Sequence, residues 1–192
     1  MSPIIVTDNG GGEYTPHPEG QYAARCIDVV DMGWQRTDFG PKYKIRVVFF
    51  CGKVERREIE GEKRDVPLTV VQFFTASLNE KANLRKFLES WRGRPFTVAE
   101  AGRFDVEKML DAPALIQVAH NKATNGKVYA NITSIMRLPQ GMNAPARPAD
   151  YVRVCERPEW TGPAPHPDTT PEHEQDPGET YTGHDDDSDL PF

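Results

Sequence analysis

The stretch "KYKIRVVFFCG", residues 42–52, decides the fold class because its side chains alternate between two chemical kinds. One set is apolar or aromatic: Tyr43, Ile45, Val47 and Phe49. The intervening set is basic: Lys42, Lys44 and Arg46. Successive side chains of an extended chain point to opposite faces, so this alternation predicts a β-strand with one buried face and one basic face.

Four further segments have the composition of strands. Residues 20–33 ("GQYAARCIDVVDMG") alternate imperfectly, which is typical of a bulged strand, and residues 66–76 ("VPLTVVQFFTA") are rich in β-branched and aromatic residues. Residues 114–121 ("ALIQVAHN") and 127–138 ("KVYANITSIMRL") are separated by "ATNGK", whose Asn-Gly pair is the strongest short signal for a hairpin. Phe73 and Phe74 are neighbours, so one points inward and one outward, and the sequence does not decide which.

The period changes from two to that of a helix after the third predicted strand. In "SLNEKANLRKFLESWRG", Ser77 and Glu80 have the spacing of a capping box, and Gly93 stands just past the predicted end. The apolar residues between them recur at helical spacing: Leu84, Phe87, Leu88 and Trp91. Residues 104–113 ("FDVEKMLDAP") predict a second, shorter helix.

The predicted order is therefore three strands, a helical segment and a two-strand hairpin. A β core whose helical insertion lies between strands three and four has the chain order of the OB-fold, a five-stranded barrel. We therefore predict a mainly β protein with an OB-fold barrel over residues 18–138, preceded by a flexible arm of residues 1–17. The alternative is a small α+β sandwich with the same element order.

The composition changes after Leu138. Ten of the 17 prolines lie between Pro139 and Pro191, and residues 150–192 hold 2 Lys+Arg against 12 Asp+Glu, whereas residues 1–149 hold 21 against 17. Such a segment buries too little apolar surface to offset its ordering entropy. The sequence thus predicts a disordered acidic linker over residues 139–184, in which residues 151–160 ("YVRVCERPEW") are best suited to pack on the body.

The chain lacks the sequence motifs of several classes of enzyme. The chain has no GxxxxGK[ST], GxSxG or HExxH motif and no cluster of carboxylates, so we expect no enzyme, no metal and no cofactor. The three cysteines, Cys26, Cys51 and Cys155, are far apart and match neither a disulfide framework nor a zinc site. No segment has the composition of a membrane span or a secretory signal, so we expect a cytoplasmic protein with no membrane partner.

One stretch combines cations with aromatic rings across a predicted loop and strand. Its residues are Trp34, Arg36, Phe39, Lys42, Lys44 and Arg46. Cations neutralise phosphates and aromatic faces stack on bases, so these side chains form a candidate surface for single-stranded nucleic acid. The predicted last hairpin adds Lys122, Lys127 and Tyr129. The alternative is an ordinary solvated basic face, with Trp34 covering one end of the barrel.

The chain ends in "DDDSDLPF", where acids precede an apolar tip. The residues are Asp185, Asp186, Asp187, Asp189, Leu190, Pro191 and Phe192. Acids alone are typical of a solvated tail, but a Leu-Pro-Phe ending gains nothing from solvation. An apolar pocket with Lys and Arg around its rim suits the Phe192 ring, the acids and a terminal carboxylate. The tip is therefore a candidate for docking on other proteins, and a solubilising tail is the alternative.

This tip resembles the C-terminal peptide of bacterial single-stranded DNA-binding proteins, in which acids precede an aliphatic residue, Pro and Phe. The body resembles OB-fold single-stranded DNA-binding proteins of tailed bacteriophages, through "GQYAARCIDVVDMGWQRTDFG", "TASLNEKANLRKFLESWRGRPFT" and "GKVYANITSIMRLPQGM". The resemblance implies sequence-independent binding of single-stranded DNA in phage DNA replication or recombination, within the bacterial host cytoplasm. It also implies replication, recombination and repair proteins as partners of the tip.

Two other functions are open at this point. The first is an interaction protein that copies the tip to compete for host replication enzymes and has no DNA affinity. The second is a small nuclease, against which the missing carboxylate or His cluster argues. The oligomeric state is also open, and a homo-oligomer is one alternative.

Overall fold

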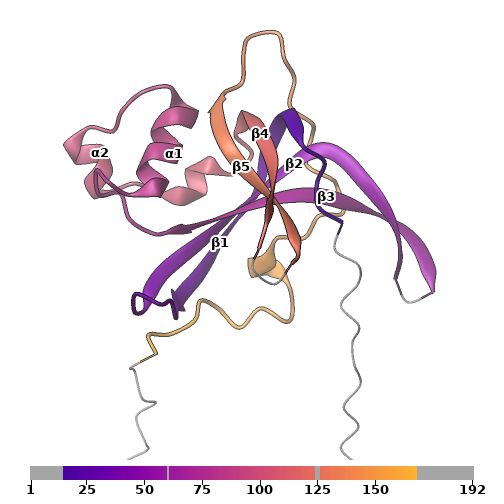
Figure 1. The fold of residues 1–192 in the computed structure, drawn as a ribbon, viewed down its shortest axis with the longest axis horizontal. Coiled ribbons are helices and arrows are strands. Elements are labelled where there is room, and N and C mark those ends of the chain that lie inside the picture. The colour runs from indigo at the N-terminus through magenta and orange to yellow at the C-terminus, as the bar shows by residue number, and fades with distance from the viewer. Residues whose placement is uncertain (1–14, 60, 124–125, 168–192) are drawn as a thin grey trace, which may run out of the picture.

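Figure 1 shows the computed structural model, which describes residues 15–59, 61–123 and 126–167. Residues 1–14, most of the predicted N-terminal arm, lie outside the described residues. So do residues 168–192, which include the end of the predicted linker and the acidic tip.

The five predicted strands are confirmed. They are β1 (Gly20–Gln35), β2 (Lys42–Ile59), β3 (Glu62–Thr75), β4 (Pro113–Lys122) and β5 (Val128–Arg137). They form one antiparallel sheet in the order β3-β2-β1-β4-β5. No ladder joins the edge strands β3 and β5 within the described residues, so the sheet is open. The two edges still approach each other, because the Ile132 backbone N–H donates to Gln72 Oε1 at 3.4 Å.

Strand β1 belongs to both halves of the sheet. Its residues 20–25 pair with β4, and its residues 25–35 pair with β2. The register with β2 shifts between Cys26 and Asp28 and again between Asp31 and Gly33. Bulges of this kind bend a strand and increase its twist, which lets one strand serve two differently oriented halves.

The hairpin of β2 and β3 is longer than predicted and extends well past the core (Figure 1). Pairing continues to Ile59 and Glu62, and three β2 residues stand against one β3 residue between the pairs Phe50–Thr69 and Val54–Pro67. The outer part of the hairpin carries the mixed charges seen in the sequence, for example an exposed ion pair of Arg56 with Asp65 at 3.0 Å. An exposed pair of this kind contributes little to stability.

Helix α1 (Asn83–Arg92) follows β3, as predicted, but it starts six residues after Ser77. Ser77 Oγ instead accepts the backbone N–H of Asn79, and Asn79 Oδ1 accepts that of Lys81. Side chains that bond two residues ahead form turns and compete with a helix, which explains why the predicted capping box is wrong. The predicted end is confirmed, because Gly93 is the C-cap with φ +69°.

Two short helices complete the insertion between β3 and β4. Helix α2 (Val98–Gly102), which the sequence reading missed, starts with a true capping box in which Thr97 and Glu100 bond each other's backbone. The second predicted helix is a single 3-10 turn, η1 (Val106–Met109), capped by Asp105. These helices and α1 lie on one side of the sheet (Figure 1).

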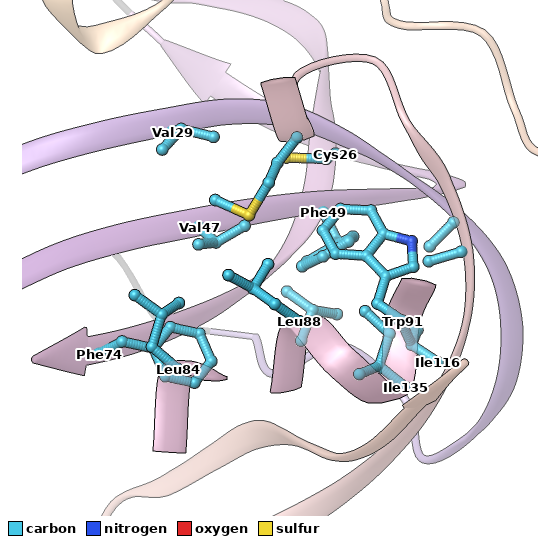
Figure 2. Close-up of a cluster of buried hydrophobic side chains, with 14 of the residues drawn as sticks. Cys26, Val29, Val47, Phe49, Phe74, Leu84, Leu88, Trp91, Ile116 and Ile135 are labelled. Atoms are coloured by element: carbon cyan, nitrogen blue, oxygen red, sulfur yellow. The ribbon is translucent and has the colours of Figure 1, made fainter. Parts of the chain in front are cut away.

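The main core lies between the sheet and α1 (Figure 2). Phe49 and Leu88 are fully enclosed there, and the ring of Trp91 lies 5.3 Å from that of Phe49. The Trp91 indole N–H donates to the Pro113 carbonyl at 2.8 Å, so its one polar group is satisfied inside the core. Phe74 also points into this core, whereas Phe73 is 54% exposed, which answers the question that the sequence left open.

A second, smaller apolar cluster lies on the opposite face of the sheet. Ile27, Val48 and Phe50 form it, and Tyr151 packs against it. Tyr151 belongs to residues 139–167, a segment that runs back along the body and is called the strap below. The strap contains one 3-10 turn, η2 (Val154–Glu156).

Asp28 anchors the strap. Its carboxylate is fully buried and accepts three hydrogen bonds, from Tyr151 Oη at 3.2 Å, Arg153 Nε at 3.1 Å and the Val154 backbone N–H at 2.8 Å. Burial, followed by the charge and hydrogen bond of Asp28, raises the pKa of Tyr151 to about 12. Arg153 also donates to Glu107 at 2.9 Å, and this bond is the largest cause that raises the pKa of Arg153.

Further contacts hold both ends of the strap. Near its start, Arg25 Nε donates to the Pro145 carbonyl at 2.7 Å, and Arg147 pairs with Asp111 at 2.6 Å. Near its end, Ala164 pairs with Gly33 on the edge of β1 that β4 leaves free. A Cβ on Gly33 would lie 2.2 Å from the Ala164 carbonyl oxygen, so glycine is required there.

The prediction of a disordered linker from Pro139 therefore needs correction for residues 139–167. The chain does not leave the body near Leu138. It stays packed on the body up to residue 167, where the described residues end. The reason is that Asp28, on the body, accepts hydrogen bonds from the strap inside the protein. The composition of the strap cannot reveal this acceptor. The expected packing of residues 151–160 agrees with the contacts of Tyr151 and Arg153.

Candidate nucleic-acid interface

The outer face of β1, β2 and β3, turned away from α1, has two halves. Along β2 it presents alternating positions: Lys42, Lys44, Arg46, Val48 and Phe50. Val48 and Phe50 are buried beneath the strap, whereas Lys42 is exposed and Lys44 and Arg46 are half-buried. The predicted basic face of β2 is therefore real, but only its first half is open.

The open half contains a shallow groove of about 530 Å³, called the basic groove below. Its lining includes Lys42, Lys44, Phe73, Thr75, Asn79 and Lys81. Strand pairing sets Lys44 opposite Thr75 and Arg46 opposite Phe73, so these side chains share the outer face. The sequence reading named Lys42, Lys44 and Arg46 but did not include Phe73 or Lys81.

Phe73 is the aromatic centre of this surface. More than half of its side chain is exposed, on a regular antiparallel ladder that fixes its backbone. A large aromatic side chain is normally buried, so this exposure leaves a flat apolar face available for contact.

The cations of the groove are available as well. Lys42, Lys44 and Lys81 have no acidic partner among the described residues. Arg46 lies in a neighbouring groove between β2, β3 and the strap, whose lining includes Tyr151 and Arg157. The Arg46 Nε atom is buried and has no hydrogen-bond partner in the described part of the chain.

The hairpin between β1 and β2 carries Arg36 and Phe39 on a tight turn, where the sequence predicts a loop. Gly40 N–H donates to the Thr37 carbonyl at 3.0 Å, and Thr37 Oγ1 donates to the Gly40 carbonyl at 2.7 Å. Gly40 has φ +88°, which a residue with a side chain rarely adopts. Phe39 is 89% exposed at this turn, and Arg36 is exposed beside it.

Trp34 lies elsewhere than the prediction placed it. It belongs to β1, not to a loop, and pairs with Tyr43, whose side chain shares the face of the core residue Ile45. Its ring contacts Tyr43 and the strap residue His166, with centroids at 5.6 and 4.4 Å. Trp34 is thus half-buried on the opposite side of the sheet from Lys42, Lys44 and Arg46.

The remaining candidates are on the hairpin of β4 and β5. Lys122 is exposed at the end of β4, Lys127 precedes β5, and Tyr129 is 38% exposed. Ala130 points into the core, whereas Val128 and Thr133 are exposed. These residues form a separate surface from the basic groove, with which they share no lining residue.

Neither a metal site nor a membrane span occurs among the residues described. No group of three or more His, Cys, Asp or Glu side chains there is arranged to hold a metal ion. No helix in that part of the chain has the length and apolar character needed to cross a bilayer.

No protein-family model and no curated protein matches this chain. The resemblance to single-stranded DNA-binding proteins therefore stays a prediction from the sequence.

Proposed function

We propose that this protein binds single-stranded DNA without reading its sequence, through the basic groove. The observation that carries the proposal is Phe73, an exposed aromatic ring on an open sheet face. Its neighbours across and along the strands include Lys44 and Arg46, and none of the groove lysines has an acidic partner among the described residues.

The chemistry of this surface suits an unpaired strand. A base can stack on the Phe73 ring, which is worth roughly 1–3 kcal/mol and tolerates any base. Lys42, Lys44 and Lys81 can meet the phosphates on either side of the stacked base. A duplex keeps its bases stacked on one another, so it can use only the cations and should bind more weakly.

We propose further that the open sheet is a member of the OB-fold class. The support is the strand order, the helical insertion between β3 and β4, and the approach of edge strands β3 and β5. In that fold the faces of strands 2 and 3 bind oligonucleotides. The basic groove lies on this face.

The biological setting is proposed from the sequence resemblance alone. It assigns the protein to phage DNA replication or recombination in the bacterial cytoplasm. It also assigns the tip, from Asp185 to Phe192, to recruiting replication and repair proteins.

A titration of labelled oligo-dT and of a matched duplex, followed by fluorescence anisotropy, tests DNA binding. The full chain and a chain without residues 168–192 are compared at several salt concentrations. We expect preferential single-strand binding that weakens with salt, and equal or tighter binding after the acidic segment is removed. Absence of single-strand binding at low salt by both chains would refute the proposal.

A second candidate is the interaction protein that copies the tip and has no DNA affinity. The observation that favours it is the strap, which covers the Val48–Phe50 half of the outer face and so shortens any path for DNA. Replacing Lys44 and Phe73 by Ala separates the two functions. The double variant should lose single-strand binding if DNA is the ligand and should leave partner binding unchanged in either case.

A further inference from the structure

A second pocket lies on the helical side of the molecule, apart from the basic groove. It has a volume of about 510 Å³ and is bounded by α1, η1 and the end of β5. Its floor is apolar and includes Leu88, Trp91, Phe104 and Met109. A pocket of this size and character can hold an aromatic side chain and its neighbours. It is called the helical pocket below.

Cations surround this floor. The lining contains Arg92, Arg94, Arg103, Lys108 and Arg137, against a single acid, Glu100. Glu100 pairs with Arg92 at 2.8 Å and with Arg94 at 2.7 Å. Arg103, Lys108 and Arg137 are exposed and have no acidic partner among the described residues, so the rim carries an uncompensated positive charge.

Arg92 forms part of the pocket wall. Its guanidinium carbon lies 4.1 Å above the Phe96 ring and 5.8 Å from that of Phe104, which holds the group flat against aromatic faces. Its Nη1 atom is buried and has no hydrogen-bond partner in the described part of the chain. Arg92 is therefore held within the pocket wall, and the exposed cations Arg103, Lys108 and Arg137 are the groups that an incoming carboxylate meets first.

The pocket therefore suits an acidic peptide that carries an aromatic side chain. The chain supplies such a peptide itself, because residues 168–192 hold nine Asp+Glu and no Lys or Arg, and they finish in Leu190, Pro191 and Phe192. We propose that the helical pocket binds the segment from Asp185 to Phe192 of the same chain. The Phe192 ring occupies the apolar floor, and the aspartates contact Arg103, Lys108 and Arg137.

The intervening chain is long enough for this contact. Seventeen residues separate Pro167 from Asp185. Fully extended they span about 60 Å, and as a flexible chain they average roughly 24 Å. A folded body of this size is only about 40 Å across. Tethering also gives the segment an effective concentration on the order of millimolar, so a weak site is sufficient.

This inference does not rest on DNA binding. The helical pocket and the basic groove share no lining residue, because the groove reaches α1 only at its first residue, Asn83, whereas the pocket lies along its last turns. An acidic segment held in the helical pocket therefore leaves the basic groove open, whereas a segment that competed with DNA would occupy the groove. The same binding would shield the tip from other proteins until they displace it.

Backbone amide chemical shifts of the full chain test the proposal, by comparison of the unchanged chain with Phe192→Ala. We expect shift differences at residues 91–94, 103–109 and 137. They should persist on about tenfold dilution, because the contact is intramolecular. Differences at residues 42–46 and 73–75 instead, loss on dilution, or no difference outside the tail would overturn it.

Charge reversal at the rim gives an independent readout that does not disturb the core. Arg103→Glu with Arg137→Glu should abolish the effect of Phe192→Ala, because both side chains are exposed and line the pocket rim. Lys86→Glu is the matched control on the exposed face of α1 and should leave the effect intact. If oligo-dT shifts the pocket amides more than those of the basic groove, the pocket is a nucleic-acid site and the proposal is wrong.

Discussion

The two halves of the outer sheet face share the same strand backbone, but the strap covers one half and leaves the other open. In one half, Val48 and Phe50 are buried by Tyr151 of the strap. In the other, Lys44 and Phe73 stand on the same ladder without such cover. Only the side chains differ, so sequence alone decides which half the protein closes with its own chain and which it leaves for a ligand.

The difference between the two halves explains why Phe73 stays exposed. The strap passes over the apolar half and reaches the far end of β1 at Ala164, yet Phe73 keeps more than half of its surface in water. Burying the cations beside Phe73 without acidic partners would carry a large desolvation cost. The cationic half therefore stays open, and its aromatic ring stays available.

The largest expected effect comes from detaching the covered half. Asp28→Asn removes the buried negative charge opposite Arg153, which is itself 13% exposed. Breaking a buried ion pair costs about 3 kcal/mol or more, so we expect the melting temperature to fall by roughly 6–12 °C. Thermal denaturation followed by circular dichroism measures this.

Asp150→Asn is the matched control, because Asp150 lies in the strap but is exposed. It should change stability by less than about 0.5 kcal/mol. If the Asp28 and Asp150 variants melt together, the strap is not held by Asp28, and the distinction between a covered and an open half fails.

The next effect concerns the open half. Phe73→Ala should weaken oligo-dT binding by about 1–3 kcal/mol, which is roughly 5- to 150-fold, without lowering the melting temperature. Val98→Ala removes an apolar side chain that is 93% exposed on α2 and is the control. Equal affinities for the two variants would show that Phe73 does not contact a base.

A smaller effect separates the cations from the ring. Lys42→Ala with Lys44→Ala should make the slope of log affinity against log salt less steep, by roughly 0.7 for each phosphate that the protein no longer neutralises. The double variant Lys63→Ala with Lys86→Ala removes two exposed lysines outside the groove and should leave the slope unchanged. Equal slopes in both double variants would mean that the groove lysines do not meet phosphates.

The smallest expected effect is a pH dependence of stability that comes from His17. It determines the pH at which variants of the two halves should be compared. His17 is fully buried, and burial lowers the pKa of its ring below 6.5. The unfolded chain then binds a proton more readily, so the stability due to neutral His17 is present above about pH 6.5 and is lost below it. Melting temperatures between pH 7.5 and 5.5 should fall, and His17→Gln should flatten this dependence; a fall of equal size in that variant would assign it to other groups.

Local patterns predicted much of the fold. The alternation along β2, the hairpin of β4 and β5 and the glycine after α1 each depend on neighbouring residues, and each appears in the structure. The capping box at Ser77 failed for a local reason too, because Asn79 draws the chain into turns before the helix can start. A capping box with the same spacing does form at Thr97 and Glu100, at the start of α2.

The strap could not be predicted from composition. Its anchor joins Arg153 to Asp28, 125 residues away in the sequence, and a count of prolines and acids is blind to such a pair. Residues 139–167 have the composition of a linker, but the body provides specific acceptors for them.

A bulge in β1 explains why the position of Trp34 was predicted wrongly. Regular pairing from Asp31–Ile45 onward would set Trp34 opposite Lys42 on the basic face. The extra residue before Gly33 shifts the register, so Trp34 faces Tyr43 on the other side. Phe73, by contrast, has the parity of Lys44 and Arg46 once Ile59 is paired with Glu62, so the position of that hairpin is all that the sequence analysis lacked.

The most direct test of the central claim is a titration of the full chain with oligo-dT, followed by backbone amide chemical shifts. We expect the largest changes at residues 42–46 and 73–75, smaller ones at residues 36–40, and none at residues 48–50 beneath the strap. Changes confined to the helical pocket, or none at low salt, would contradict the claim that the open half of the outer face binds single-stranded DNA.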